Sequence, residues 1–184
     1  MNMFSNVQAE GMEEAKDVVG SSFDPVPTDV YDATIKLAYA GESQAGAKNV
    51  TFILNVNGQE HRETIYVTTR NGEAFYLDKE KKKQPLPGWS TVEDLCLFTA
   101  EKDLTQMEME EKTVKVFDPA ARKEVNKAVP VLTEMLGKPI KVALQRQIVD
   151  KEKKGDDGEY RPTGETRTQN EVVKFLHPET SRTI

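Results

Sequence analysis

The chain has 184 residues and a formal net charge of −6, with 37% hydrophobic and 30% charged residues. This length and composition suit one globular domain with appendages and exclude a wholly disordered chain. No apolar run approaches the roughly 18 residues that a membrane-spanning helix needs, which excludes a membrane protein, and the single cysteine, Cys96, excludes an internal disulfide framework or a multi-cysteine zinc site.

The acidic mean conceals an uneven distribution of charge. Residues 1–29 carry a net charge of −5 and residues 89–137 carry −4, whereas residues 30–88 and 138–184 carry +1 and +2. A negative net charge would by itself argue against a nucleic-acid partner. Because the segments that we expect to form strands are neutral to slightly basic, a locally basic cleft is compatible with the composition.

The N-terminal residues predict an arm that precedes the folded domain. Residues 1–22 lack sustained periodicity and contain several acidic residues together with Gly11 and Gly20. We therefore expect residues 1–22 to be a flexible acidic N-terminal arm and residues 23–184 to form the domain.

A three-stranded antiparallel meander is predicted to begin the domain. Apolar residues alternate with polar ones over residues 31–39, 50–56 and 62–69, a pattern typical of half-buried strands. Asn57-Gly58 is typical of a type I′ hairpin turn, because both central residues of that turn need a positive φ. In the first strand, one core-facing side is expected to carry Tyr31, Ala33, Ile35, Leu37 and Tyr39. In the third strand, the side away from the core is expected to carry Arg62, Thr64, Tyr66 and Thr68.

A mixed connection follows the meander. Ser90-Thr91-Val92-Glu93 is a capping-box sequence and predicts a short helix that begins there. Residues 113–117 predict a short strand. Residues 130–136 resemble a helix, with Gly137 as its C-cap.

Two long strands over residues 140–148 and 166–175 complete the domain, joined by a polar, glycine-rich hairpin over residues 150–164. The chain is thus predicted to be mainly β, with five strands and an elaborated helical connection between strands 3 and 4. That arrangement is typical of the OB-fold, a five-stranded Greek-key barrel. A generic β-sandwich or an α+β sheet has a similar strand count and stays open as an alternative.

The sequence carries few signals of catalysis. It has no phosphate-binding glycine motif, and its two histidines, His61 and His177, are interpreted as exposed and non-catalytic. Cys96 shares the apolar side of the predicted helix and is expected to be a buried small hydrophobe. We therefore predict a protein that is not an enzyme, with no cofactor and no metal site.

The same sequence contains the residue types that bind single-stranded nucleic acid, which needs aromatic rings for base stacking and basic residues for phosphates. Tyr66 is the leading candidate, because it projects from the polar side of its strand beside basic residues. Of the adjacent pair Phe75 and Tyr76, we expect Phe75 to point inward and Tyr76 outward. Trp89 could equally plug the end of the barrel. The complete set of nucleic-acid-binding candidates is Tyr66, Tyr76, Trp89, Arg62, Arg70, Lys79, Lys81, Lys141, Tyr160 and Arg161.

Several motifs resemble a known family. Phe23-Asp24-Pro25, the Asn57-Gly58 hairpin with Glu63 to Val67, Leu86-Pro87-Gly88-Trp89, and Thr163 to Arg167 before Asn170-Glu171 together resemble single-stranded DNA-binding proteins of tailed bacteriophages. The resemblance covers about residues 23–180. It implies an OB-fold, sequence-tolerant binding of single-stranded DNA, and a role in phage replication, recombination or repair in the cytoplasm of the infected bacterial host.

The resemblance also implies partners. Besides single-stranded DNA, phage or host replication proteins are candidates, and no membrane is expected. Such proteins commonly finish with an acidic tail that recruits partners, whereas this chain ends at Ser181-Arg182-Thr183-Ile184 without an acidic run. Either a tail has been removed, or recruitment uses another surface such as the acidic arm.

Two other functions compete with DNA binding. One is a phage protein–protein interaction or assembly module on a β-barrel that does not bind nucleic acid. The other, ranked third, is a nuclease that uses the acidic middle stretch and a divalent metal.

Overall fold

The computed structural model describes residues 25–118, 123–155 and 160–182. The predicted acidic arm lies outside the described residues. The described chain forms two compact units, of which the larger contains residues 26–147 and 170–182 and the smaller contains Pro25 and residues 148–169. The prediction of a mainly β protein is confirmed: the described residues form nine strands, one α-helix and one 3₁₀ turn.

The meander is confirmed. Strand β1 (Asp29–Glu42) pairs with β2 (Lys48–Val56), and β2 pairs with β3 (Gln59–Tyr66), both antiparallel. The turn between β2 and β3 has φ values of 51° at Asn57 and 82° at Gly58, the positive values that a type I′ turn requires.

The single core-facing side predicted for β1 is wrong beyond Ile35. The register with β2 shifts between Ile35 and Leu37, so that Lys36 is an extra residue in β1. Such a β-bulge changes which side of the sheet each following side chain faces. Ala38 is therefore buried with the main core, while Leu37 and Tyr39 pack on the opposite side of the sheet.

Helix α1 (Pro87–Ala100) begins before the position predicted for it. Its N-cap is Leu86, which makes no side-chain capping bond, and the backbone N–H of Ser90 donates to the carbonyl of Leu86 at 3.1 Å. The expected capping box is therefore wrong, because Pro87 at the first helical position already has the φ that a helix start needs. A Cβ on Gly88 would lie 2.1 Å from the carbonyl oxygen of Tyr66, so the start of α1 packs directly against the end of β3.

Besides α1, two short strands and a long hairpin lie between β3 and the C-terminal strands in the sequence. Strands β4 (Phe75–Leu77) and β5 (Lys83–Pro85) form a separate two-stranded sheet. Strands β6 (Met109–Asp118) and β7 (Lys123–Leu132) form an antiparallel hairpin, so the strand predicted over 113–117 is confirmed and longer than expected.

The helix predicted over residues 130–136 is wrong. Residues up to Leu132 belong to β7, and only a 3₁₀ turn, η1 (Thr133–Met135), follows them. Val125, Val129 and Val131 alternate along β7, and Pro130, with its fixed φ, fits an exposed strand position opposite Glu111. Gly137 has a φ of 76°, the left-handed conformation expected of it.

The two C-terminal strands are longer than predicted. β8 (Pro139–Lys154) and β9 (Tyr160–Leu176) extend through most of the stretch that we expected to be a polar hairpin loop. Hydrogen bonds, rather than the burial of apolar side chains, hold the polar ends of β8 and β9 together. The Thr163 hydroxyl, for example, donates to the carbonyl of Lys151 at 3.0 Å. The Lys151 ammonium also pairs with the Glu165 carboxylate at 3.0 Å.

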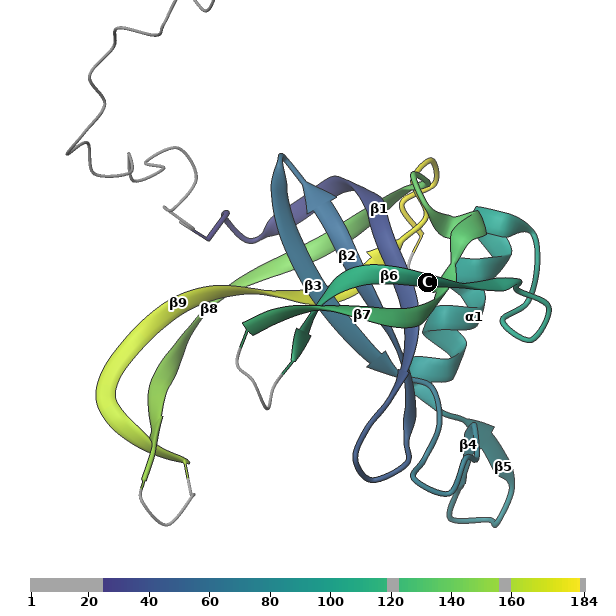
Figure 1. The fold of residues 1–184 in the computed structure, drawn as a ribbon, viewed down its shortest axis with the longest axis horizontal. Helices are drawn as coiled ribbons and strands as arrows, with labels where there is room; N and C mark the ends of the chain where they lie inside the picture. Colours follow the sequence, from purple (N-terminus) through teal and green to yellow (C-terminus); the bar gives the residue numbers. More distant parts are fainter. Residues whose placement is uncertain (1–24, 119–122, 156–159, 183–184) are drawn as a thin grey trace, which may run out of the picture. The chain divides into compact units, whose positions relative to one another are not determined.

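The larger sheet has the order β3-β2-β1-β7-β6, and β8 also pairs with β1. In Figure 1 it is a curled antiparallel sheet that resembles a half-barrel, with α1 beside it. The main core lies on one side of the meander and includes Ile35, Phe52, Leu54, Leu95 and Val142. A second, smaller cluster lies on the other side of the meander and consists of Tyr39, Val116, Val129 and Val131, with Leu37, Val114, Val125 and Leu136 packed against it.

Candidate nucleic-acid interface

A groove of about 1060 Å³ lies on the side of the meander that faces away from the main core. One wall is formed by the ends of β1, β2 and β3 with the loop between β1 and β2, and the other by the β6–β7 hairpin. In Figure 1 this hairpin crosses in front of the meander, in agreement with the contacts between Tyr39 and the valines of β6 and β7. The second cluster therefore fixes the hairpin in place and leaves the groove beside it.

Tyr66 and Arg62 line this groove together with Thr64. The three residues are spaced by two along β3 and share one side of the strand, as predicted, whereas Thr68, expected on that side as well, lies beyond the end of β3 and is buried. The side chain of Tyr66 is 52% exposed, although it belongs to a strand whose other side contributes to the core. A half-exposed aromatic ring in a groove is suited to stack against a planar group such as a nucleobase.

Arg62 is oriented by a residue that the sequence did not identify as part of the site. Its Nη2 donates a hydrogen bond of 3.0 Å to the hydroxyl of Tyr39. Tyr39 is only 6% exposed and packs in the second cluster, yet its side chain also lines the groove. The guanidinium of Arg62 is thus fixed through a buried aromatic anchor.

Polar and charged side chains from β1, β2, β3 and β7 line the groove. The hydroxyls of Thr51 and Thr64 lie 3.0 Å apart in a hydrogen bond across the β2–β3 pair. Among the residues that line the groove, Arg62, Lys48 and Lys127 are basic and Glu42 is acidic. The lining is therefore net positive in a protein that is net negative.

Lys48 and Lys127 are groove residues that sequence reasoning missed. Lys48 begins β2 and Lys127 lies in β7, within a segment for which the sequence predicted no helix or strand. The spacing of Val125, Val129 and Val131 in multiples of two residues is the signal that could have indicated a strand, and it places Lys127 on the same side as these valines.

The β4–β5 hairpin carries Tyr76, Lys79 and Lys81 outside the groove lining. Tyr76 is 49% exposed, so its expected outward orientation is confirmed, whereas Phe75 is half-buried and belongs to neither hydrophobic cluster, with the Lys83 ammonium 4.3 Å from its ring centroid. Lys79 and Lys81 are exposed in the turn between β4 and β5, where Lys81 has a φ of 62°. We name the β4–β5 hairpin, residues 75–85, the lysine hairpin. The side chains of Tyr76, Lys79 and Lys81 make it a second candidate surface.

The turn of the lysine hairpin is ordered by one carboxylate. Oδ1 of Asp78 accepts backbone N–H bonds from Glu80 and Lys82, both at 2.9 Å, and Oδ2 accepts from the amide of Gln84 at 3.0 Å. The bond from Gln84, and then that from Lys82, hold the pKa of Asp78 below its ordinary value. The turn that presents the lysines therefore has a defined shape.

Arg70, Trp89 and Lys141 also lie outside the groove lining. Arg70 is exposed, and its carbonyl lies close to Gly46 in the β1–β2 loop. Trp89 is half-buried against the main core, and its indole N–H donates to Glu93 at 3.0 Å.

Lys141 lies on β8, where its ammonium is 3.3 Å from the Ser181 hydroxyl and 3.9 Å from the Asp32 carboxylate. Tyr160 and Arg161 begin β9 in the smaller unit and are exposed there, with Tyr160 at 57%.

The histidines and the cysteine, which are the side chains most often used in catalysis, lie outside the groove lining. Both histidines are half-buried rather than exposed, and burial lowers the pKa of His61. Cys96 is buried as predicted, and burial, followed by the charge of Glu93, raises the pKa of its thiol to about 12. Within the described ranges, no group of three or more His, Cys, Asp or Glu side chains could hold a metal ion.

The one α-helix of the described residues, α1, has 14 residues, and no helix there has the length and apolar character needed to cross a membrane. In comparisons with known proteins, no family model, curated protein or solved structure matches this chain.

Proposed function

We propose that this protein binds single-stranded DNA without catalysis and with little preference for base sequence. The observation that carries the proposal is the pairing of a half-exposed tyrosine, Tyr66, with an anchored arginine, Arg62, in one net-positive groove. Stacking on an aromatic ring tolerates any base, because every base has a π-face, while basic side chains follow the phosphates. The groove offers both kinds of contact within one surface.

The geometry favours a single strand over a duplex. In a duplex the faces of the bases are covered by their neighbours, and only their edges and the phosphates are accessible. The ring of Tyr66 can contribute stacking energy only to an unstacked base. Because the protein is net negative, it lacks the general positive charge that would hold a duplex by phosphate contacts alone.

We further propose that the larger unit is an OB-fold with an inserted hairpin. In support, β1 pairs with both β2 and β8, and α1 lies between the meander and the C-terminal strands in the sequence. On this interpretation β8 and β9 are the fourth and fifth strands of the barrel, and β6–β7 is the insertion. OB-folds bind their ligands across the second and third strands, which is where Tyr66, Thr64 and Thr51 line the groove.

The wider role follows from the resemblance of the sequence motifs to phage single-stranded DNA-binding proteins. The protein would protect single-stranded DNA during phage replication, recombination or repair in the cytoplasm of an infected bacterium. Phage or host replication proteins would be its further partners.

A titration of fluorescently labelled oligo(dT), followed by anisotropy at two salt concentrations, tests the proposal. The parent protein should bind, more weakly at the higher salt. Tyr66→Ala should weaken binding by about tenfold or more, since stacking contributes about 1–3 kcal/mol per base. Tyr66→Phe keeps the aromatic ring and should keep most of the affinity. Absence of binding to the parent would refute the proposed function, whereas equal affinities of the parent and Tyr66→Ala would remove the groove as its site.

A protein-interaction or assembly module is the second candidate. One observation favours it: the β6–β7 wall of the groove presents Val116, Val129 and Pro130, which could contact an apolar peptide. This function predicts no salt-dependent binding of oligo(dT), so the same titration separates it from the first.

A further inference from the structure

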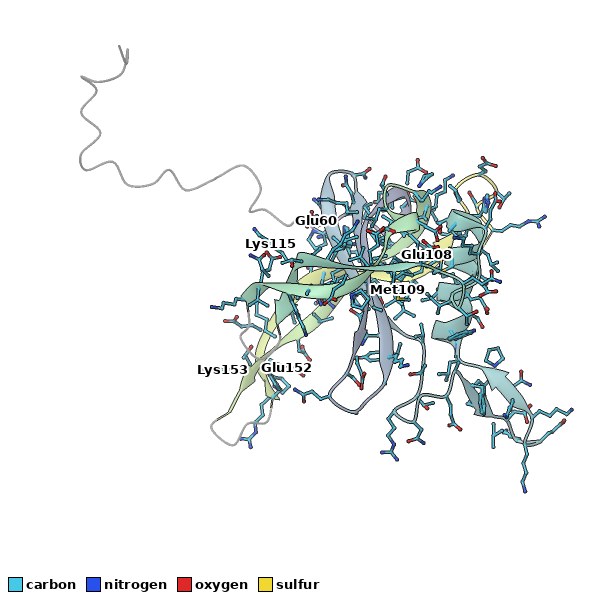
Figure 2. The ribbon with its side chains drawn as sticks, turned by 45° about the vertical axis from the view of Figure 1, so that its right-hand side comes forward. Glu60, Glu108, Met109, Lys115, Glu152 and Lys153 are labelled. Carbon is cyan, nitrogen blue, oxygen red and sulfur yellow. The ribbon has the colours of Figure 1, made fainter. Side chains whose placement is uncertain are left out.

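Strand β6 forms one edge of the larger sheet. On one side it pairs with β7 along all ten of its residues, and within the described chain no strand pairs with its other side. Figure 2 labels Met109 at the start of β6 and Lys115 further along it. An edge strand has free N–H and C=O groups along its outer side and can pair with another strand.

The side chains of β6 are complementary to a second copy of the same strand. When two copies align antiparallel about Thr113, Glu111 of each copy lies opposite Lys115 of the other, and the two threonines face each other. Directly opposed residues of unlike charge stabilise an antiparallel pair, and opposed threonines can hydrogen-bond. The alignment gives two such ion pairs, because the two-fold axis repeats each contact.

These residues are available for this pairing. Glu111, Thr113 and Lys115 are exposed and alternate with Val114 and Val116, which point toward the second cluster. Within one copy, Glu111 and Lys115 are four residues apart on an extended strand, or about 13 Å, too far to pair. In the described part of the chain, the ion pair on β6 joins Lys112 to Glu110, and Glu111 and Lys115 take part in none.

The opposite edge of the sheet, β3, is less suited to pairing. The start of α1 packs against its end, where Gly88 closely approaches the carbonyl of Tyr66. Along its length, Glu63 lies close enough to Glu171 of β9 for that carboxylate to raise the pKa of Glu63. The start of α1 would therefore obstruct pairing at the end of β3, whereas no strand pairs with the outer side of β6 among the described residues.

We propose that two copies of this protein pair through β6 to form a two-fold symmetric dimer with one continuous sheet. The two strands run antiparallel about Thr113 and are joined by backbone hydrogen bonds and two Glu111–Lys115 ion pairs between copies. A two-fold arrangement uses the same edge on both copies and is closed, so it stops at the dimer. The proposal is independent of DNA binding.

Sedimentation equilibrium of the full chain without DNA, over about a hundredfold range of protein concentration, tests the proposal. The parent should be in reversible monomer–dimer equilibrium. Lys115→Glu places two glutamates opposite each other at both contacts and should weaken the dimer by about tenfold or more. Glu111→Lys should do the same. The double variant, Glu111→Lys with Lys115→Glu, restores both ion pairs and should restore the dimer.

Lys138→Glu is the matched control, because Lys138 is exposed outside β6 and carries the same charge. It should leave the dimer unchanged, and circular dichroism should show that all variants are folded. A parent that is monomeric at every concentration would overturn the proposal. A dimer that is insensitive to Lys115→Glu, or one that the double variant does not restore, would equally overturn pairing through β6.

Discussion

The hydroxyl of Tyr39 accepts a hydrogen bond of 3.0 Å from Nη2 of Arg62, and this bond links a buried cluster to the surface of the groove. Tyr39 is held by Val116, Val129 and Val131, so its hydroxyl has a fixed position. An arginine side chain on a solvated strand normally samples many rotamers, and ordering it costs entropy. Because the bond orders Arg62 before a ligand arrives, less of that entropy is lost on binding.

Tyr39→Phe should therefore weaken oligo(dT) binding and also lower the stability by about 1 kcal/mol, because the variant keeps the packed ring and loses one hydrogen bond. Ordering the released Arg62 side chain on binding costs about 1 kcal/mol, which corresponds to about fivefold in affinity. Tyr31→Phe is the matched control, because the Tyr31 hydroxyl donates to the carbonyl of Pro27 and Tyr31 does not line the groove. Anisotropy titrations of both variants and the parent measure the effect. Equal losses in the two variants would contradict a positioning role for Tyr39.

The basic residues of the groove should determine the salt dependence of binding. For single-stranded DNA, each phosphate contact adds about 0.7 to the slope of log affinity against log salt concentration. Arg62→Ala and Lys127→Ala should each reduce that slope by about 0.7. Lys138→Ala, outside the groove lining, should leave it unchanged. If Lys127→Ala had the parent slope, the β6–β7 wall would not contact phosphate.

Gly88→Ala should destabilise the fold and disturb the groove. The added Cβ would lie 2.1 Å from the Tyr66 carbonyl oxygen and 3.0 Å from Cγ2 of Ile65, so the start of α1 must move away from β3. Overpacking of this kind costs about 1–3 kcal/mol. Thermal or urea unfolding measures the cost.

Ser90→Ala, in the same turn of α1, is the control for Gly88→Ala. It should change the stability by less than about 0.5 kcal/mol, because Ser90 does not cap the helix. A loss near 1 kcal/mol would instead indicate the capping box.

Because of Glu63, the stability of the folded protein should fall as the pH rises above the ordinary pKa of a glutamate. Desolvation, and then the charge of Glu171, raise the pKa of Glu63 above 4.5 in the folded state. The folded state thus binds the proton more tightly than the unfolded state does, and its stability falls as the pH rises from about 4.5 through the raised pKa. Glu63→Gln should be more stable than the parent at neutral pH, and the difference should shrink in acid.

Urea unfolding of Glu63→Gln across this pH range measures the effect. Glu73→Gln, at an exposed position, should follow the parent. A Glu63→Gln variant whose advantage is the same at acidic and neutral pH would contradict the raised pKa.

The parts of the fold that the sequence predicted correctly have strong local signals. Alternation along β2 and β3, together with Asn57-Gly58, determines which side chains of β3 face away from the core, and so Arg62 and Tyr66 could be placed on one side. The helix start was misplaced because Ser90 and Glu93 have the spacing of a capping box while Pro87, three residues earlier, starts the helix. The sequence predicts a helix over residues 130–136, whereas the structure has the end of β7 and a 3₁₀ turn there. Short apolar runs fit a strand or a helix equally well.

The missed parts of the site depend on contacts between distant segments. Nothing in the residues around Lys36 indicates a bulge, which comes from the register between β1 and β2. If side chains alternated regularly along β1 with Lys36 included, Tyr39 would face the main core. Lys48 and Lys127 line the same groove only because β7 packs onto the meander near Tyr39.

The extra residue at Lys36 gives β1 two roles, since it lets one strand supply Ile35 and Ala38 to the main core and Leu37 and Tyr39 to the opposite side. Deletion of Lys36 would remove the bulge and leave these sides unchanged, because Leu37 would then follow Ile35 directly in the ladder with β2. A regular pairing that included Lys36 would instead turn Tyr39 toward the main core. Both the support of the β6–β7 hairpin and the anchor of Arg62 would then be lost together, so the exclusion of Lys36 from the ladder, rather than the length of β1, maintains this groove.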